Sequence, residues 1–243
     1  MFIKEVHLKE NVSSDEYPYN ISAIKNLESL KFDKPVTFFT GENGSGKSTL
    51  IEAIAINMGI NPEGGSQNFA FHTRDTHSNL YKGILIDKGF ERPSTKYFLR
   101  AESFYNVASE VDRMLEEDGN ISAFLAHGGV SLHESSHGES FFQLIKNRFY
   151  ERGLYILDEP EAALSPQRQL SLLIIIDDLV KKGAQFIIAT HSPIILSYPN
   201  SEIYQFDNTI KMVNYKDSEV YKMYKLFIDN PEMMVQRLLK EDN

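Results

Sequence analysis

The sequence predicts an α/β protein with a mainly parallel β-sheet flanked by helices. A glycine-rich loop at residues 41–48 stands between an apolar run at 35–40 and a segment of helical periodicity at 49–56. Two more runs, at 154–157 and 184–190, are short and almost entirely apolar, as expected of parallel strands that are buried on both faces. Strands that alternate with helices around such a loop indicate a largely parallel sheet.

The length of the chain favours one domain. A chain of 243 residues can bury one sizeable core, so we expect a single domain over residues 1–243 with a helical lobe inserted at about 103–150. Its hydrophobic content of 42% is that of an ordinary globular protein, and the longest aliphatic run, residues 172–176, is far too short to cross a bilayer. We therefore expect no membrane insertion.

The net charge and the cysteine content further restrict the kinds of partner, metal site and cellular compartment that we expect. The net charge of −9 argues against long-range attraction of the whole molecule to bare nucleic acid, although a local basic groove stays open. With no cysteine, the chain has neither a disulfide framework nor a thiolate metal site, which fits a reducing cytoplasm. We therefore expect a cytoplasmic protein.

The N-terminal part begins with strand-like segments. Residues 2–8 alternate between apolar and polar side chains, and residues 21–32 are again β-like. After the first helix and an irregular loop, we expect two strands at 81–87 and 96–101, joined by a turn.

The middle of the chain returns to helical patterns. A helical pattern at 103–117 begins the inserted lobe, and a Ser/His/Glu-rich loop opens a second helix at 141–149. Ser165 and Pro166 suit the N-cap and first position of a helix that Gly183 ends. The remaining elements lie at the C-terminus: a hairpin at 202–215 and one or two helices at 220–240.

The loop at residues 41–48 reads Gly-Glu-Asn-Gly-Ser-Gly-Lys-Ser, a complete phosphate-binding motif between a strand and a helix. Its glycines allow backbone N–H groups to turn toward phosphate oxygens at the N-terminus of the helix, where the helix dipole is positive. Lys47 supplies a charge for the β- and γ-phosphates, and Ser48 supplies a hydroxyl for Mg²⁺. The sequence therefore predicts binding of a nucleoside triphosphate through Glu42, Asn43, Gly44, Ser45, Gly46, Lys47, Ser48 and Thr49.

Two acidic residues follow the buried strand at 154–157. Asp158 and Glu159 lie at its carboxyl end, the edge where open α/β sheets bind ligands. Asp158 suits the Mg²⁺ shell, and Glu159 suits the orientation or deprotonation of an attacking water. His191 ends the next strand and has the donor chemistry to bond a γ-phosphate, although a single histidine at a strand end is more often structural. The predicted catalytic residues are Lys47, Glu159 and His191, and the predicted Mg²⁺ ligands are Ser48 and Asp158.

In this order, the phosphate loop, Leu157-Asp-Glu-Pro160 and Thr190-His191-Ser192 resemble the Walker A, Walker B and switch-histidine motifs of the ABC-type ATPases. The resemblance covers nearly the whole chain. It implies the P-loop NTPase fold of that family, with a mainly parallel sheet, an antiparallel β portion near the N-terminus and an inserted helical lobe. It also implies hydrolysis of ATP to ADP and phosphate with Mg²⁺ as cofactor.

The family also has a signature sequence just before Walker B. Residues 135–139, Ser-Ser-His-Gly-Glu, occupy that place and keep Ser136 and Gly138 of the family pattern, with Glu139 in place of its glutamine. By resemblance, Ser136, Gly138 and Glu139 meet the γ-phosphate that is bound to a second subunit. The resemblance therefore implies an ATP-dependent homodimer that works as a nucleotide-driven switch.

The residues around the motifs favour one branch of the family. Glu161 follows Asp-Glu-Pro, and Ser192-Pro193 follow the switch histidine, which resembles soluble ABC-type ATPases of genome maintenance and antiphage defence. That resemblance implies a DNA or protein effector as partner. Two alternatives stay open: the ATP-binding subunit of a membrane transporter, and a non-hydrolysing nucleotide sensor that scaffolds an effector.

The sequence does not fix two further family positions. An aromatic residue upstream of the phosphate loop usually stacks on the adenine, and Tyr17 and Tyr19 both suit that place, although each also suits an ordinary exposed or core position. The family's Q-loop glutamine should follow the strand at 96–101, and no glutamine follows it. We therefore assign no water-positioning glutamine.

Overall fold

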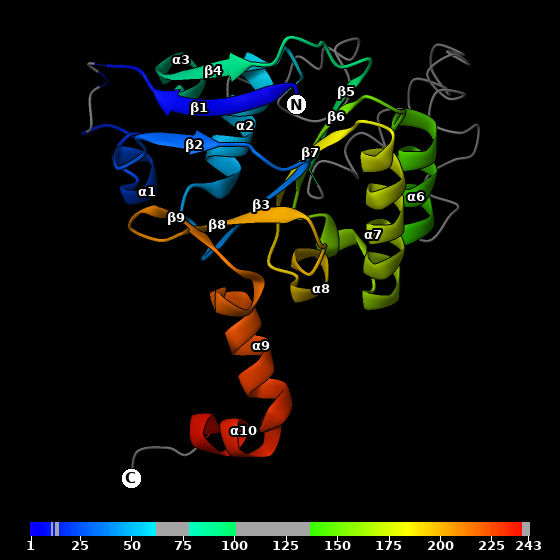
Figure 1. Cartoon of the computed structure of the whole chain (residues 1–243). Helices are drawn as coiled ribbons and strands as arrows, with labels where there is room; N and C mark the ends of the chain where they lie inside the picture. Colours follow the sequence, from blue (N-terminus) through cyan, green and yellow to red (C-terminus); the bar gives the residue numbers. More distant parts are fainter. Residues whose placement is uncertain (11, 13–14, 62–77, 101–136, 240–243) are drawn as a thin grey trace, which may run out of the picture.

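The computed structural model describes residues 1–10, 12, 15–61, 78–100 and 137–239, which contain two β-sheets (Figure 1). The larger sheet has the strand order β5-β6-β7-β3-β8-β9. Its strands are β3 (Val36–Gly41), β5 (Lys96–Arg100), β6 (Leu154–Asp158), β7 (Gln185–Ala189), β8 (Ser201–Phe206) and β9 (Ile210–Val213). All neighbours from β5 to β8 are parallel, and only β9 runs antiparallel to its neighbour. This confirms the predicted mainly parallel sheet.

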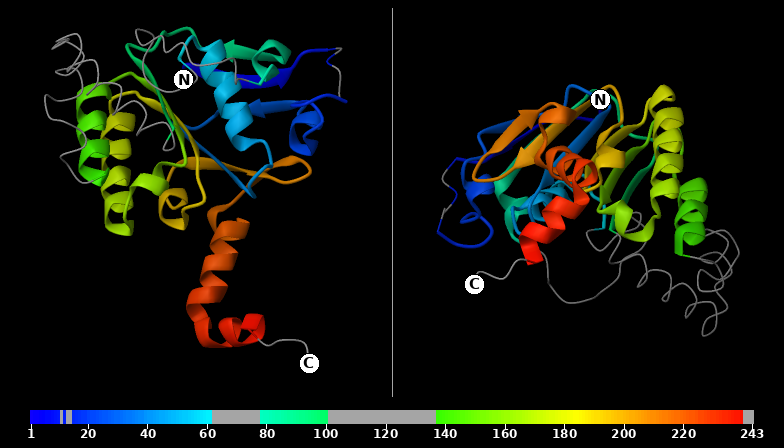
Figure 2. Two further views of the ribbon diagram at one scale, coloured as in Figure 1. Left: turned by 180° about the vertical axis from the view of Figure 1, so that it is seen from behind. Right: turned by 90° about the horizontal axis from the view of Figure 1, so that it is seen from below.

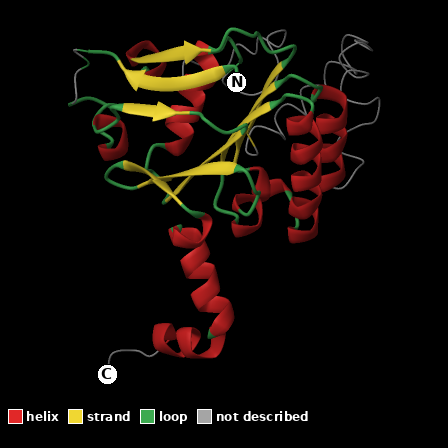
Figure 3. Ribbon diagram, in the orientation of Figure 1, coloured by secondary structure: helices red, strands yellow, loops and turns green. Residues whose placement is uncertain are grey.

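The smaller sheet is antiparallel and lies near the N-terminus, as predicted. It has the order β2-β1-β4, with β1 at Ile3–Leu8, β2 at Ser29–Lys31 and β4 at Ile84–Lys88. The two sheets form separate groups of strands in Figure 3. The buried side chain of Gln185 on β7 joins them, because its Oε1 accepts hydrogen bonds from the backbone N–H groups of Phe2 (2.7 Å) and Ile3 (3.0 Å).

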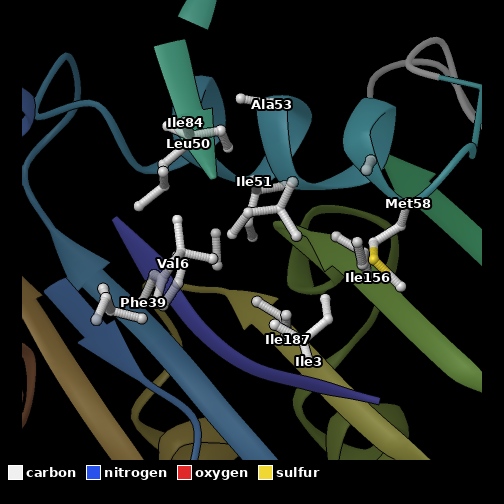
Figure 4. Close-up of a cluster of buried hydrophobic side chains, with 14 of the residues drawn as sticks. Ile3, Val6, Phe39, Leu50, Ile51, Ala53, Met58, Ile84, Ile156 and Ile187 are labelled. Atoms are coloured by element: carbon white, nitrogen blue, oxygen red, sulfur yellow. The ribbon is translucent and has the colours of Figure 1, made fainter. Parts of the chain in front are cut away.

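Helix α2 (Lys47–Asn57) packs between the two sheets. Its residues Leu50 and Ile51 belong to a fully buried cluster that includes Val6 of the small sheet and Ile156 and Ile187 of the large sheet (Figure 4). A second cluster covers the other face of the large sheet and takes side chains from α6 (His137–Arg148), α7 (Pro166–Lys181) and α8 (Pro193–Leu196). The central strands β6 and β7 are therefore buried on both faces, which explains their almost entirely apolar sequences.

Two predicted β segments contain one-turn helices instead. Within residues 21–32, Ser22–Lys25 form α1 before β2 begins, and within 81–87 the chain first forms α3 (Leu80–Gly83) and then β4. Elements of four residues are too short to show a helical period, so the sequence pattern of their apolar residues is interpreted as a β-strand. The turn after β4 joins two different sheets, since β4 pairs with β1 whereas β5 pairs with β6.

The predicted inserted lobe lies mostly outside the described residues. The helix expected at 103–117 falls there entirely. The helix expected at 141–149 begins earlier, at His137, so that Gly138 and Glu139 belong to its first turn rather than to the preceding loop.

The C-terminal predictions are confirmed. Ser165 caps α7, with its Oγ accepting a hydrogen bond from the Arg168 backbone N–H (3.4 Å), and Gly183 follows the helix with φ +84°. Strands β8 and β9 form the expected hairpin, and two helices follow, α9 (Glu219–Asp229) and α10 (Pro231–Leu239). These two helices extend away from the sheets (Figures 1 and 2). None of the helices in the described ranges is both long and apolar enough to span a bilayer.

Candidate functional site

The glycine-rich loop connects the end of β3 to the N-terminus of α2. Gly41 has φ +140°, and a Cβ atom there would lie 2.2 Å from the Phe206 carbonyl oxygen, so only glycine fits against β8. Gly44 and Gly46 also have positive φ angles, and Gly46 is the N-cap of α2. The loop therefore presents a helix N-terminus, where backbone N–H groups and the helix dipole attract anions.

Lys47 is folded over its own loop. Its side chain is buried, and the Nζ donates hydrogen bonds to the carbonyl oxygens of Gly41 (2.7 Å) and Glu42 (2.8 Å). Burial lowers the pKa of Lys47, while the charges of Glu159 and Asp158 act to raise it. The ammonium group is thus held over the loop in a position from which it can meet phosphate oxygens.

Asp158 ends β6 and contacts the first turn of α2. The Ser48 hydroxyl donates a hydrogen bond to Asp158 Oδ1 (3.0 Å), and the side chain of Asp158 is only 4% exposed. Burial raises the pKa of Asp158, although the Arg100 charge and the Ser48 hydrogen bond act to lower it. The two predicted metal ligands are therefore adjacent, because Walker A and Walker B meet at the carboxyl edge of the sheet.

Glu159 and His191 face each other beside this pair. Glu159 adopts a left-handed conformation (φ 51°, ψ 51°) that is unusual for a residue with a side chain and is often found at functional sites. Its carboxylate lies 3.6 Å from His191 Nε2. That nitrogen is buried and has no hydrogen-bond partner among the described residues. Burial and the charge of Lys47 lower the pKa of His191, and Glu159 raises it in part.

Glu161 fixes the loop that carries His191. Its carboxylate accepts hydrogen bonds from the Thr190 hydroxyl (2.7 Å) and from the His191 backbone N–H (2.5 Å). Burial raises the pKa of Glu161, and these two hydrogen bonds oppose that rise. The Glu161 side chain therefore connects the turn after Walker B (Pro160–Ala163) to the loop that contains Thr190 and His191, which we call the switch loop.

A hollow of about 300 Å³ lies over the phosphate loop. The residues that line it are Tyr17, Ile21, Asn43, Gly44, Gly46, Lys47, Ser48, Thr49 and Glu159. Of the two tyrosines considered for the adenine, only Tyr17 lines it, and its side chain is exposed. Tyr19 instead packs beside Gly83, and its hydroxyl donates a hydrogen bond to the Asn79 carbonyl oxygen (3.0 Å).

The polar atoms around the hollow suit a phosphorylated ligand. Two buried polar atoms, Ser45 Oγ in the phosphate loop and His191 Nε2, have no hydrogen-bond partner in the described part of the chain. The hydroxyl of Ser48 and the carboxylate of Asp158 are the hard oxygen donors that Mg²⁺ prefers. A metal-bound nucleotide therefore fits this site chemically.

Most of the predicted site residues come together here. The loop residues, Asp158, Glu159 and His191 share one edge of the sheet. Ser136 lies outside the described residues, and Gly138 and Glu139 are placed in α6 by their backbone alone. Arg100, which was not among the predicted residues, forms an ion pair with Asp158 and also ends a strand at this edge.

Comparison with known proteins places the chain in a family. Residues 19–153, more than half of the chain, match a family model described as "AAA domain". The chain belongs to the AAA-domain family. Residues 130–197 of this AAA-domain protein also match a model described as "AAA domain, putative AbiEii toxin, Type IV TA system". The phosphate loop lies within the first matched range, and Asp158, Glu159 and His191 lie within the second.

Curated relatives of the AAA-domain chain include ATP-binding proteins of sugar import. The xylose import ATP-binding protein XylG of Escherichia coli K12 is 31% identical over 195 residues, which are 71% of this chain. The protein of the same name from Shigella flexneri is 29% identical over the same length. The chain spans only about a third of these relatives, since the matched part is 36% of their length.

Solved structures show that the AAA-domain chain has the fold of ABC-type ATPases. CbiO1 of Clostridium perfringens, part of an ABC transporter complex, aligns with a TM-score of 0.50 and 18% identity, covering 98% of this chain and 99% of its own. A bacterial Atm1-family ABC exporter with ATP bound aligns with a TM-score of 0.50 and 15% identity, over 92% of this chain and 42% of the exporter.

The Glu161 contacts generate a stability prediction. Glu161→Ala removes the acceptor for the Thr190 hydroxyl and the His191 N–H, and we expect it to lower the free energy of unfolding by about 2–4 kcal/mol. The measurement is equilibrium unfolding in urea. Glu91→Ala, which removes an exposed partner of Arg152, is the control and should change stability by less than about 0.5 kcal/mol. Equal losses in the two variants would show that Glu161 does not anchor the switch loop.

Proposed function

We propose that the chain hydrolyses ATP to ADP and phosphate at the carboxyl edge of its larger sheet. The observation that carries this proposal is the position of Glu159, which lines the hollow over the phosphate loop and lies 3.6 Å from the unpartnered Nε2 of His191. A carboxylate beside a phosphate site can orient and deprotonate water, and a nearby imidazole can bind the γ-phosphate. Membership of the AAA-domain family supports the same reaction class.

Each side chain then has a role in the reaction. The loop N–H groups and Lys47 hold the β- and γ-phosphates, Ser48 and Asp158 hold Mg²⁺, and Tyr17 stacks on the adenine. Bound Mg²⁺ neutralises charge on the phosphate oxygens. Glu159 takes a proton from the attacking water, and His191 donates a hydrogen bond to the γ-phosphate. Glu161 holds the His191 backbone in position.

The hydrolysis site is proposed to be shared between two copies of the chain. The described residues supply the phosphate loop, Walker B and the switch histidine, while the signature residues Ser136, Gly138 and Glu139 are assigned to the partner's nucleotide. A head-to-tail homodimer of this kind has two equivalent composite sites and closes on itself. ATP then acts as the link between the subunits, and hydrolysis releases them.

We place this switch in genome maintenance or antiphage defence, in the cytoplasm, with a DNA or protein effector. The match of residues 130–197 to the model described for a toxin–antitoxin system supports the defence branch. The sequence around the switch histidine, Thr190-His191-Ser192-Pro193, supports the same branch.

A second candidate is the ATP-binding subunit of a membrane transporter. It is favoured by the curated relatives, which are named as xylose import ATP-binding proteins, and by the similarity of fold to CbiO1. In that role, the chain would dock on separate membrane-spanning subunits. A third candidate, a non-hydrolysing sensor, would need no general base, which argues against it because Glu159 lines the hollow.

Glu159→Gln tests the general base. The amide cannot accept the proton of water, so we expect turnover to fall by about 10²–10⁴-fold while ATP binding persists and the dimer accumulates with ATP. Steady-state phosphate release and sedimentation with ATP measure these effects. Glu232→Gln on α10, an exposed residue in a helix that extends from the body, is the control and should leave both unchanged. Full turnover in Glu159→Gln would remove Glu159 from this role.

Tyr17→Ala tests the adenine contact. Loss of a stacking ring should weaken ATP binding by about tenfold, whereas Tyr17→Phe should keep wild-type affinity because the ring remains. Calorimetric titration with ATP gives the dissociation constants. Tyr224→Ala, an exposed tyrosine on α9, is the control. Unchanged affinity in Tyr17→Ala would place the adenine elsewhere.

The effector class is tested by phosphate release with and without added duplex DNA. A DNA-linked switch should hydrolyse ATP several-fold faster with DNA, and the stimulation should fall as salt rises because phosphate contacts are screened. Co-purification with membranes, without stimulation by DNA, would instead support the transporter candidate. Absence of any phosphate release under either condition would support the sensor.

A further inference from the structure

Arg100 lies against the proposed metal ligand. It is the last residue of β5 and is paired in register with Asp158 on β6. Its Nε lies 3.2 Å from Asp158 Oδ2, and its second terminal nitrogen lies 3.1 Å from Glu52 Oε2 on α2. The three side chains are only 22%, 4% and 11% exposed, respectively. Arg100 therefore forms one partly buried ion triad with two carboxylates.

Both oxygens of Asp158 are already engaged. Oδ1 accepts the hydrogen bond from Ser48, and Oδ2 accepts the one from Arg100. A divalent cation on Asp158 would need the same oxygens, at the short distances and fixed geometry that Mg²⁺ demands. A guanidinium and a divalent cation also repel each other. Arg100 and a metal therefore compete for one carboxylate.

We propose that Arg100 is a built-in competitor of the metal: it holds the Asp158 carboxylate when no divalent cation is bound there and releases it when the carboxylate takes one. This inference rests on the proposed function, because it assigns Asp158 to the metal. The ion pair with Arg100 keeps the Asp158 carboxylate neutralised and oriented between turnovers. It also sets the metal affinity of the site, since each binding event has to break one charged hydrogen bond.

Glu52 gives the released arginine a partner. It lies one helical turn after Ser48 on α2, so it stays beside Arg100 whichever cation Asp158 holds. Burial lowers the pKa of Arg100, but the charges of Asp158 and Glu52 more than offset this, and its pKa is raised. Arg100 thus stays charged, and a charge this far from water needs the Glu52 counter-charge.

If Arg100 competes with the metal, substitutions of Arg100 and of Glu52 should change the metal affinity in opposite directions. A merely structural ion triad would not show this. Arg100→Gln removes the competing cation and should bind metal more tightly. Glu52→Gln leaves Arg100 with Asp158 alone, strengthens that pair and should bind metal more weakly. A structural triad would lose stability in both variants without changing metal affinity in opposite directions.

The experiment measures Mn²⁺ affinity of the full chain at fixed, saturating ADP, from the electron paramagnetic resonance signal of free Mn²⁺. We expect Arg100→Gln to bind Mn²⁺ about tenfold more tightly than wild type and Glu52→Gln to bind it about tenfold more weakly. Arg152→Gln is the matched control, because it also removes one positive charge from an Arg–Glu pair, but one that is 59% and 68% exposed. It should match wild type.

Each outcome is decisive. Equal Mn²⁺ affinity in wild type, Arg100→Gln and Glu52→Gln would overturn the inference while leaving the metal site in place. If wild type and Arg152→Gln bind no Mn²⁺ beyond that held by ADP itself, the proposed function fails first. If one of the two triad variants does not fold, the direction of the shift in the other still supports or overturns the competition.

Discussion

The site depends on one contact, the hydrogen bond between Ser48 and Asp158. It joins the first turn of α2 to the end of β6, although the two residues are 110 positions apart in the chain. The contact requires β7 to lie between β6 and β3, so that parallel strands end together on one edge. Packing of α2 between the two sheets then fixes the direction in which its N-terminus points. Without that arrangement, the loop and the acidic pair would be unrelated segments.

Several charged side chains gather at this edge of the sheet. Asp158, Glu159 and Glu161 lie around Lys47, and each acts on its pKa. Arg100 forms ion pairs with both Asp158 and Glu52, while backbone and hydroxyl donors stabilise Glu161. A site with this many carboxylates would repel a triphosphate unless cations were present, which is consistent with a nucleotide that arrives with a divalent metal. The acidic net charge of the molecule and an anion-binding loop are therefore compatible, because the loop acts through local dipoles and a single lysine.

The sequence predicted the parts that have strong local signals. Almost entirely apolar runs predicted β6 and β7, the Ser165-Pro166 pair predicted the start of α7, and the Walker motifs predicted that the loop, Asp158 and Glu159 belong to one site. The one-turn helices α1 and α3 were missed because four residues show no period. Arg100 was missed because its role depends on the β5–β6 register, and Tyr17 could be separated from Tyr19 only by the tertiary contact in which the Tyr19 hydroxyl donates a hydrogen bond to the Asn79 carbonyl oxygen. The anchoring role of Glu161 likewise depends on two loops meeting in space.

The central claim is that this chain is one half of a composite ATP site, and mixing two inactive variants tests it most directly. Lys47→Ala disables the phosphate loop but keeps the signature, whereas Ser136→Arg disables the signature but keeps the loop. In a head-to-tail dimer, a heterodimer of the two has one intact site, so an equimolar mixture should recover about a quarter of wild-type phosphate release, although each variant alone is inactive. No recovery at any mixing ratio, with both variants folded and able to associate, would contradict the composite site.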